Sequence, residues 1–259
     1  MAAPVLVAPD GPLIIPPLLT SDTSLSVIVP TFLESENIGQ FLLALSEALG
    51  PVLSSGYEII VVDDNSPDGT LEIAAEKANG YPQIRLVRRM GRRELATAVV
   101  RGWQVARGKI LATINADFQH PPGLMAEMWK RVQAADLVVA SRYCDGGSCG
   151  EWSMLRRSLG GGARWLGRIL LPEVFSRVTD PLSGCFMFRR GALAGVELNP
   201  IGFKSLVEVL ARGNAATIVE CPYRMRERKR GSSKANGARL LDYIVQLGRL
   251  RKALRKAHP

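Results

Sequence analysis

Histidine and cysteine are both scarce in this 259-residue chain, and this scarcity argues against several classes of enzyme. The two histidines are His120 and His258. A Ser-His-Asp hydrolase would have to use His120, and no G-x-S-x-G motif accompanies it. The four cysteines form no C-x-x-C pair, which disfavours a zinc site. So few cysteines in a chain of this length favour reduced thiols over a disulfide framework.

Long apolar runs are also missing. The longest apolar stretches reach about half of the ~20 residues that a membrane-spanning helix needs. The segment Met1–Thr20 is apolar, but it contains five prolines and no basic residue, unlike a secretory signal peptide. We expect residues 1–22 to form a flexible tail, with docking onto the domain as the alternative.

Most of the chain lacks a net positive charge, and the excess of basic residues lies at its C-terminal end. Residues 224–259 contain twelve lysines and arginines and two acidic residues, a net charge of +10, whereas the whole chain carries +9. A diphosphate, an anionic membrane surface or nucleic acid would each complement this charge. No aromatic residue follows Tyr243, and no nucleic-acid motif is present, so we expect no nucleic-acid partner.

Apolar runs alternate with helix-like patterns along the chain, and this alternation predicts an α/β domain with a mostly parallel central sheet and helices on both faces. We expect strands at Leu25–Pro30, Tyr57–Asp63, Ile84–Arg88, Lys109–Asn115, Leu137–Ala140, Cys185–Arg189 and Thr217–Tyr223. We expect helices at Glu36–Leu53, Leu71–Ala78, Glu94–Ala106, Pro122–Ala134, Glu151–Leu171, Phe203–Arg212 and Gly237–Ala257. The first strand runs into P-T-F-L-E rather than G-x-G-x-x-G, which disfavours a Rossmann dehydrogenase, and the chain has no Walker loop.

Acidic and amide side chains follow three of the expected strands. The segments are Ser26–Asn37, Glu58–Thr70 and Ile110–Pro122, and each is an apolar run that stops at turn-forming polar residues. In an open α/β sheet, ligands bind beyond the carboxyl ends of the strands. We therefore expect these three strand ends to share one site.

The third of these segments predicts a metal site. Asn115, Asp117 and Gln119 lie two residues apart, and in an extended chain that spacing puts all three on one side of the backbone. Their oxygens suit Mg²⁺ or Mn²⁺ rather than zinc. A polar turn closed by Pro121–Pro122 is the alternative interpretation.

Four further motifs follow these strand ends in order. They are S-R-Y at Ser141–Tyr143, E-W-S-M-L-R-R at Glu151–Arg157, D-P-L-S-G at Asp180–Gly184 and R-K-R-G-S-S-K at Arg228–Lys234. With these motifs the chain resembles inverting GT-A glycosyltransferases of family two, and within them the polyprenyl-phosphate (dolichyl-phosphate) mannose synthases. The resemblance runs from about residue 25 to residue 236.

This resemblance implies a fold and a domain organisation. It implies a GT-A domain over residues 23–236, in which a Rossmann-like half binds the nucleotide. The tail at 1–22 would precede this domain, and a basic amphipathic helix at 237–259 would follow it.

The resemblance also implies a binding site for a nucleotide sugar. The implied residues are Pro30, Phe32, Glu34, Asp63, Asp64, Arg228, Ser233 and Lys234. One of Asp63 and Asp64 is expected to contact the nucleoside, and the other is expected to be a structural cap. The basic loop, hinged at Gly231, would clamp the donor diphosphate. A solvated basic loop is the alternative for that segment.

The chain departs from the family pattern at several positions. Asn115 stands where the metal cluster normally has Asp, so we expect weaker metal binding with Asp117 as the main anchor. Leu33 stands where Asn is frequent. Glu94 and Ala96 occupy positions that are usually glycine, which leaves the shape of the donor loop and the identity of the donor open.

The implied catalytic residues are Asp117, Asp180, Arg142 and Arg157. Arg142 and Arg157 would bind the acceptor phosphate, and Asp180 would orient a sugar hydroxyl or a cation. A lipid monophosphate has a second pKa near ~6, so it is largely dianionic at neutral pH and attacks without a general base.

The activity implied is transfer of a hexose, foremost mannose from GDP-mannose, to a polyprenyl phosphate with inversion. The alternatives are a UDP-glucose-dependent polyprenyl-phosphate glucosyltransferase and a non-catalytic GT-A partner subunit. We expect a cytoplasmic protein that binds the cytoplasmic face of a membrane peripherally, with a membrane-protein partner as a further candidate. Glu151–Phe175 and Leu240–Ala257 combine apolar and basic residues and would meet the lipid, and helices packed on the core are the alternative for both.

Overall fold

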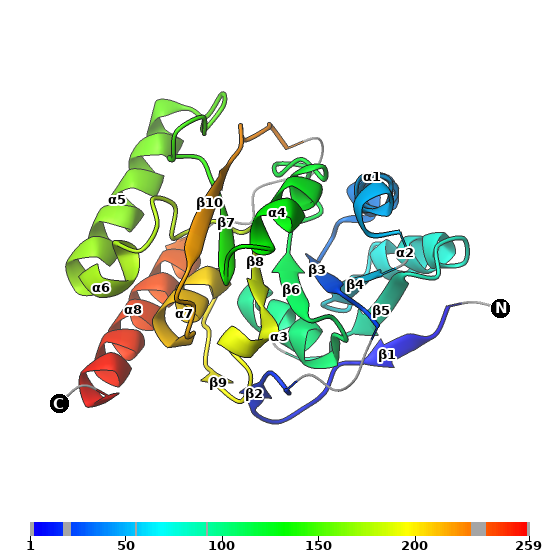
Figure 1. Ribbon diagram of the computed structural model, residues 1–259, viewed down its shortest axis with the longest axis horizontal. Helices are drawn as coiled ribbons and strands as arrows, with labels where there is room; N and C mark the ends of the chain where they lie inside the picture. Colours follow the sequence, from blue (N-terminus) through cyan, green and yellow to red (C-terminus); the bar gives the residue numbers. More distant parts are fainter. Residues whose placement is uncertain (1–2, 18–21, 55, 92, 229–236, 258–259) are drawn as a thin grey trace.

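The computed structural model of the chain describes residues 3–17, 22–54, 56–91, 93–228 and 237–257. Its centre is an eight-stranded sheet (Figure 1). From one edge to the other, the strands are β1 (Val5–Val7), β5 (Ile84–Arg88), β4 (Tyr57–Asp63), β3 (Leu25–Thr31), β6 (Ile110–Thr113), β8 (Phe186–Arg189), β7 (Leu137–Ser141) and β10 (Ile218–Pro222). Strand β8 runs antiparallel to β6 and β7, and the other neighbouring strands pair in parallel. The prediction of a mostly parallel sheet is confirmed.

Helices cover both faces of this sheet. One face is covered by α1 (Ser35–Leu53), α2 (Thr70–Ala78) and α4 (Leu124–Val132). The other face is covered by α3 (Leu95–Val105), α6 (Pro172–Phe175), α7 (Ser205–Arg212) and α8 (Gly237–Ala257). Helix α5 (Met154–Leu170) packs on α6 and α8, beyond the β10 edge of the sheet (Figure 1).

The central strands are buried on both faces. In β3, Val27 and Val29 belong to the core under α1, whereas Ile28 belongs to the core under α3. A parallel strand that is covered on both sides favours apolar residues at most positions, which is why these strands read as nearly continuous apolar runs. Each of the seven strands and seven helices that the sequence predicted is present, with bounds that differ by at most three residues.

The N-terminal segment is the main correction to the predicted fold. We expected a flexible tail over residues 1–22, and this prediction is wrong for most of the part that the structure describes. Strand β1 pairs in parallel with β5, and the short strand β2 (Leu13–Ile14) pairs with β9 (Glu197–Leu198). Ile15 is fully buried, and Arg190 donates a hydrogen bond to the carbonyl oxygen of Pro16. The unpaired edge of β5 and the burial of Ile15 explain why this segment is ordered.

The C-terminal helix α8 begins at the predicted residue and packs on the domain through one face. Tyr243, Leu247 and Leu250 are buried. The Tyr243 hydroxyl donates to the carbonyl oxygen of Ala163 at 2.8 Å, which ties α8 to α5. Among the described residues, no helix is both long enough and apolar enough to cross a bilayer.

Candidate active site

The three strand ends that carry polar clusters lie side by side. Strands β4, β3 and β6 are consecutive in the sheet, and Thr31 at the end of β3 pairs with Asp63 at the end of β4. The three clusters therefore lie together beyond the carboxyl ends of these central strands, as the sequence predicted.

The predicted metal cluster lies in a turn and not on an extended strand. Strand β6 ends at Thr113, and Phe118 has a φ of 59°, in the left-handed region, so Asn115, Asp117 and Gln119 do not alternate along one strand as we expected. Asp117 is buried, and one of its carboxylate oxygens accepts the Gln119 N–H at 3.1 Å. Its other oxygen, Oδ2, accepts a hydrogen bond from the Arg228 guanidinium at 2.9 Å.

These residues fit a hard divalent cation, with one carboxylate and two amides as oxygen donors. Asn115 Oδ1 is buried and has no hydrogen-bond partner among the described residues, so it is available to a cation. Within the same described part, no three His, Cys, Asp or Glu side chains form a metal cluster. A metal at this position would thus depend on Asp117 as its charged ligand, with Asn115 and Gln119 as neutral ligands.

The structure gives Asp63 and Asp64 different surroundings. Asp63 is fully buried, and its oxygens accept hydrogen bonds from the Thr31 hydroxyl and from both the N–H and the hydroxyl of Ser66, each at 2.7 Å. Asp63 is therefore the structural cap of the pair. Asp64 forms a bidentate ion pair with Arg89 at 2.5 and 2.6 Å. Burial raises the pKa of the Asp64 carboxyl, although Arg89 opposes this shift.

The first loop follows β3 directly. Pro30 is buried within the strand, and the Arg93 guanidinium lies 4.5 Å from the centre of the Phe32 ring. Glu34 immediately precedes α1, where its backbone carbonyl accepts the N–H groups of Asn37 and Ile38. Its carboxylate accepts a hydrogen bond from the Asn37 side chain at 3.0 Å. Leu33 has a φ of 56°, a conformation that Asn adopts at lower cost than Leu.

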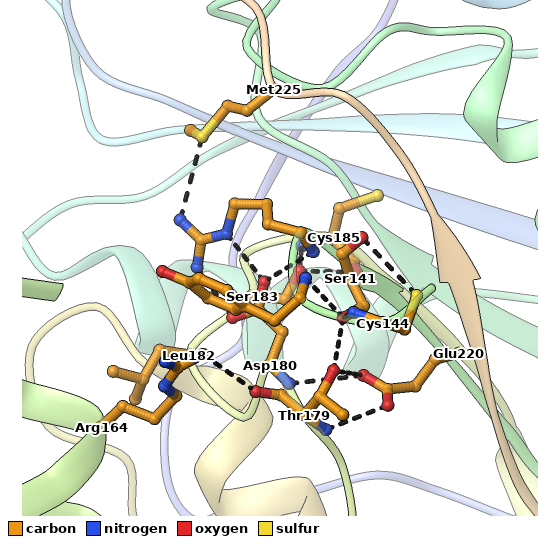
Figure 2. A network of polar contacts seen from close by, with 12 residues as sticks. Ser141, Cys144, Arg164, Thr179, Asp180, Leu182, Ser183, Cys185, Glu220 and Met225 are labelled. Atoms are coloured by element: carbon orange, nitrogen blue, oxygen red, sulfur yellow. Dashed lines mark hydrogen bonds and ion pairs between the residues drawn. The ribbon is translucent and has the colours of Figure 1, made fainter. Parts of the chain in front are cut away.

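Arg142, which follows β7 directly, forms a buried ion pair with Asp180. Figure 2 shows Asp180 among its polar neighbours. Arg142 donates from Nε and Nη2 to the two oxygens of Asp180 at 2.7 and 2.8 Å. Asp180 is fully buried, and its backbone N–H donates to Glu220 at 3.3 Å. The cation that Asp180 orients is therefore the Arg142 guanidinium, whose Nη1 points to the sulfur of Met225 at 3.8 Å.

A cleft of about 640 Å³ opens next to this pair. It is lined by the segment Tyr223–Glu227, by Gly150 and Glu151, and by the start of α4. Arg157 donates to the carbonyl oxygen of Gly150 at 2.8 Å, and Arg142 contacts Met225. Both predicted acceptor arginines thus contact residues of the cleft wall. Ser233 and Lys234 lie outside the described residues.

The sequence indicated no role in this site for His120 and Lys204, two buried residues that interact electrostatically with Arg142 and Asp180. Burial lowers the pKa of His120 to about 3, so this imidazole is neutral. The ammonium of Lys204 donates to the carbonyl oxygen of Leu182 at 2.8 Å, and burial, with a contribution from Arg142, lowers its pKa to about 7. No motif marks Lys204, because its partner lies 22 residues earlier in the chain.

Comparison with known proteins identifies the family. Residues 26–196 match the model described as Glycosyl transferase family 2. The chain is 39% identical over 228 residues to a dolichol-phosphate mannosyltransferase of Pyrococcus furiosus, covering 88% of this chain and 63% of the relative. It is 32% identical to the Saccharomyces cerevisiae protein of that name, covering 87% and 86%, and 30% identical to a polyprenol monophosphomannose synthase of Mycolicibacterium smegmatis, covering 85% and 84%.

Solved structures share the fold at lower identity. Glucosyl-3-phosphoglycerate synthase from Mycobacterium tuberculosis, in complex with Mn²⁺, UDP-glucose and phosphoglyceric acid, superposes with a TM-score of 0.66 at 20% identity, covering 89% of this chain and 80% of that one. Mannosyl-3-phosphoglycerate synthase from Rubrobacter xylanophilus gives 0.64 at 18% identity, covering 91% and 75%. The predicted GT-A fold is confirmed. Together with the strand-end site, these comparisons show that the chain belongs to glycosyl transferase family 2.

Proposed function

We propose that this chain transfers mannose from GDP-mannose to the phosphate of a polyprenyl lipid, with inversion at the anomeric carbon. The relatives at 30–39% identity are named for mannose transfer to dolichol phosphate or polyprenol phosphate. The observation that carries the proposal is the separation of two sets of cations. Arg228 lies on the predicted metal cluster, whereas Arg142 and Arg157 contact the wall of the neighbouring cleft.

Two anionic reactants explain this division. The donor diphosphate would lie at the ends of β3, β4 and β6, near Arg228, and the lipid phosphate would enter the cleft near Arg142 and Arg157. An oxygen of the lipid phosphate attacks the anomeric carbon as the bond from that carbon to the diphosphate breaks. The products are the mannosyl phosphate lipid and GDP. No proton has to be removed from the attacking dianion, so the protein has to align the two anions and hold the leaving group.

The metal-binding residues fit the donor half of this reaction. Asp117, with Asn115 and Gln119, would hold Mg²⁺ or Mn²⁺, and the cation would neutralise charge that develops on the leaving diphosphate. The residues that we propose for the nucleotide and the basic loop are Pro30, Phe32, Glu34, Asp63, Asp64, Arg228, Ser233 and Lys234, with Asp63 acting through the local fold.

We also propose that the protein binds a membrane surface peripherally, because its acceptor is a lipid. Helix α5 exposes Met154, Leu159, Trp165 and Ile169, and the first turns of α8 expose Leu240, Leu241, Ile244 and Val245. The last turns of α8 carry five basic residues. Exposed apolar side chains next to positive charge suit an anionic lipid surface.

A thermal-protection panel separates this proposal from its alternatives. The melting temperature is measured with GDP, UDP, GDP-mannose and UDP-glucose, each with and without Mn²⁺. We expect GDP-mannose with Mn²⁺ to raise it most, because at equal concentration the ligand that binds the folded state most tightly stabilises it most. A larger shift with UDP-glucose would favour the glucosyltransferase, and no shift with any nucleotide would favour the non-catalytic subunit.

A further inference from the structure

We propose that Arg164 on α5 is a positioning residue for the acceptor phosphate, and that it acts on Arg142 through the ring of Tyr143. The inference rests on the proposed function, in which Arg142 binds the lipid phosphate. Arg164 itself does not have to touch the substrate.

Three cation–π contacts link the side chains of two arginines and two aromatic residues. The Arg164 guanidinium carbon lies 3.8 Å from the centre of the Tyr143 ring. The guanidinium carbon of Arg142 lies 5.3 Å from the same ring and 4.9 Å from the ring of Trp152. These separations are within the range of cation–π attraction, which is strongest where water is excluded. The Arg142 side chain is largely buried, so its contacts with both rings contribute to its orientation.

Arg164 also contacts the segment that holds the partner of Arg142. Its Nη1 donates to the carbonyl oxygen of Thr179 at 3.4 Å, and Thr179 immediately precedes Asp180 (Figure 2). Thr179 is fixed in turn by Glu220, which accepts hydrogen bonds from its N–H at 3.0 Å and from its hydroxyl at 2.8 Å. Arg164 therefore bridges the residue after Arg142 and the residue before Asp180.

The contacts of Arg164 matter because the affinity for the lipid phosphate depends on where one nitrogen of Arg142, Nη1, points. Asp180 takes Nε and Nη2 of Arg142, which fixes the guanidinium within its own plane. The contacts with the rings of Tyr143 and Trp152 constrain it further. The remaining nitrogen, Nη1, faces Met225 on the cleft wall, and a thioether is a weak acceptor. A phosphate oxygen would replace that weak contact with a charge-assisted hydrogen bond, provided that the ion pair and the ring contacts hold the guanidinium in place.

Helix α5 has neighbouring residues that face the outer surface and the interior. Trp165, next to Arg164 in the sequence, is 66% exposed on the outer surface that we propose for lipid contact. Arg164 is turned inward, onto Tyr143. Helix α5 thus connects the proposed lipid surface to the arginine that would bind the lipid phosphate.

The test compares the Michaelis constants of variants for the two substrates in detergent micelles, which removes the effect of membrane recruitment. Arg164→Ala should raise the Michaelis constant for polyprenyl phosphate roughly three- to thirty-fold, which is the size of a partly desolvated cation–π contact. The constant for GDP-mannose should stay within about twofold, and Arg164→Lys should lie between wild type and Arg164→Ala. Arg168→Ala removes the same charge from the exposed side of the same helix and should change neither constant appreciably.

Substitutions of Tyr143 test the route independently, and they keep the inference testable if Arg164→Ala does not fold. Tyr143→Phe keeps the ring and should resemble wild type, whereas Tyr143→Leu removes the ring and should resemble Arg164→Ala. If Arg164→Ala behaves like Arg168→Ala, raises both Michaelis constants equally, or is not matched by Tyr143→Leu, the inference is wrong while the proposed function stands. If wild type transfers no mannose to the lipid phosphate, the proposed function fails, and the inference fails with it.

Discussion

At the scale of single residues, the contact between Asp117 and Arg228 affects how tightly a metal can bind. The guanidinium occupies Oδ2, and the Gln119 N–H occupies Oδ1. A divalent ion that uses Oδ2 must compete with Arg228, at a site where Asn115 supplies no charge. A donor diphosphate would offer Arg228 another anion, so nucleotide and metal should bind more tightly together than either binds alone.

This competition predicts that Arg228→Ala tightens Mn²⁺ binding in the absence of nucleotide. The gain should be roughly tenfold, the size of one charge-assisted hydrogen bond. Asn115→Asp should also tighten binding, because it adds a negative charge to the cluster. The dissociation constant is measured from the electron paramagnetic resonance signal of free Mn²⁺.

Arg226→Ala is the matched control for this experiment. Arg226 is exposed and lies two residues away, and its backbone N–H donates to the carbonyl oxygen of Gln119 at 3.1 Å. Loss of its side chain removes the same charge but leaves the contact with Asp117. Equal Mn²⁺ affinity in wild type and Arg228→Ala would show that Arg228 does not compete with the metal.

The residue scale is also where sequence reasoning was least complete. The sequence does not indicate which of Asp63 and Asp64 is the structural cap, and only the fold distinguishes their roles. Thr31 lies 32 residues before Asp63 but directly opposite it in the sheet, so Asp63 turns inward. The sequence likewise identified Arg142 and Asp180 without indicating that they bind each other, because 38 residues separate them.

At the scale of elements, the turn before α5 fixes one wall of the cleft. Gly150 has a φ of 60°, in the left-handed region, and a Cβ atom there would collide with the carbonyl oxygen of Met225. Gly161, within α5, would place its Cβ in open space. The two glycines therefore have opposite roles, since the first permits close approach of two backbones and the second only weakens a helix.

These roles predict opposite effects of alanine. Gly150→Ala should lower the free energy of unfolding by at least ~1–2 kcal/mol, because a left-handed conformation and a backbone clash both oppose the Cβ. Gly161→Ala should raise it by ~0.5–1 kcal/mol through helix propensity. Urea denaturation measures both. A neutral Gly150→Ala would mean that the turn and Met225 do not pack as closely as described.

The sequence predicted most elements well because their patterns are local. Strands β4 and β5 and helix α8 have the predicted bounds, and the buried strands are recognisable in the sequence as apolar runs. Strand β1 was missed because three exposed residues gain their structure only from pairing with β5, about 80 residues away. Helix α5 was expected from residue 151 and begins at Met154.

At the scale of the whole molecule, exposed apolar side chains and basic charge lie at the same end. Figure 1 shows α5 and α8 together beyond β10, whereas β1 forms the opposite edge of the sheet. The fold thus gathers two segments that are far apart in the sequence into one candidate lipid-facing surface. Sequence patterns alone left membrane contact and core packing open for both helices. The structure shows that α8 has a buried face and an exposed face, whereas the inner face of α5 is only half-buried.

This arrangement predicts membrane binding that depends on both charge and apolar contact. The protein should co-sediment with vesicles that contain phosphatidylserine, and binding should fall as salt rises because exposed charges are screened. Trp165→Ala should weaken binding, whereas Val7→Ala, at a still more exposed site on the opposite edge, should not. Release by detergent alone, with no effect of salt, would instead point to a hydrophobic anchor or a membrane-protein partner.

The most direct test of the account is transfer of radiolabelled mannose from GDP-mannose to polyprenyl phosphate in micelles, with Mn²⁺ present. Wild type and Asn115→Asp should both form the labelled lipid, and Asp117→Ala, which lacks the charged metal ligand, should form none. Each variant is first shown to be folded by its thermal transition. Absence of labelled lipid with wild type, or full transfer by Asp117→Ala, would contradict the account.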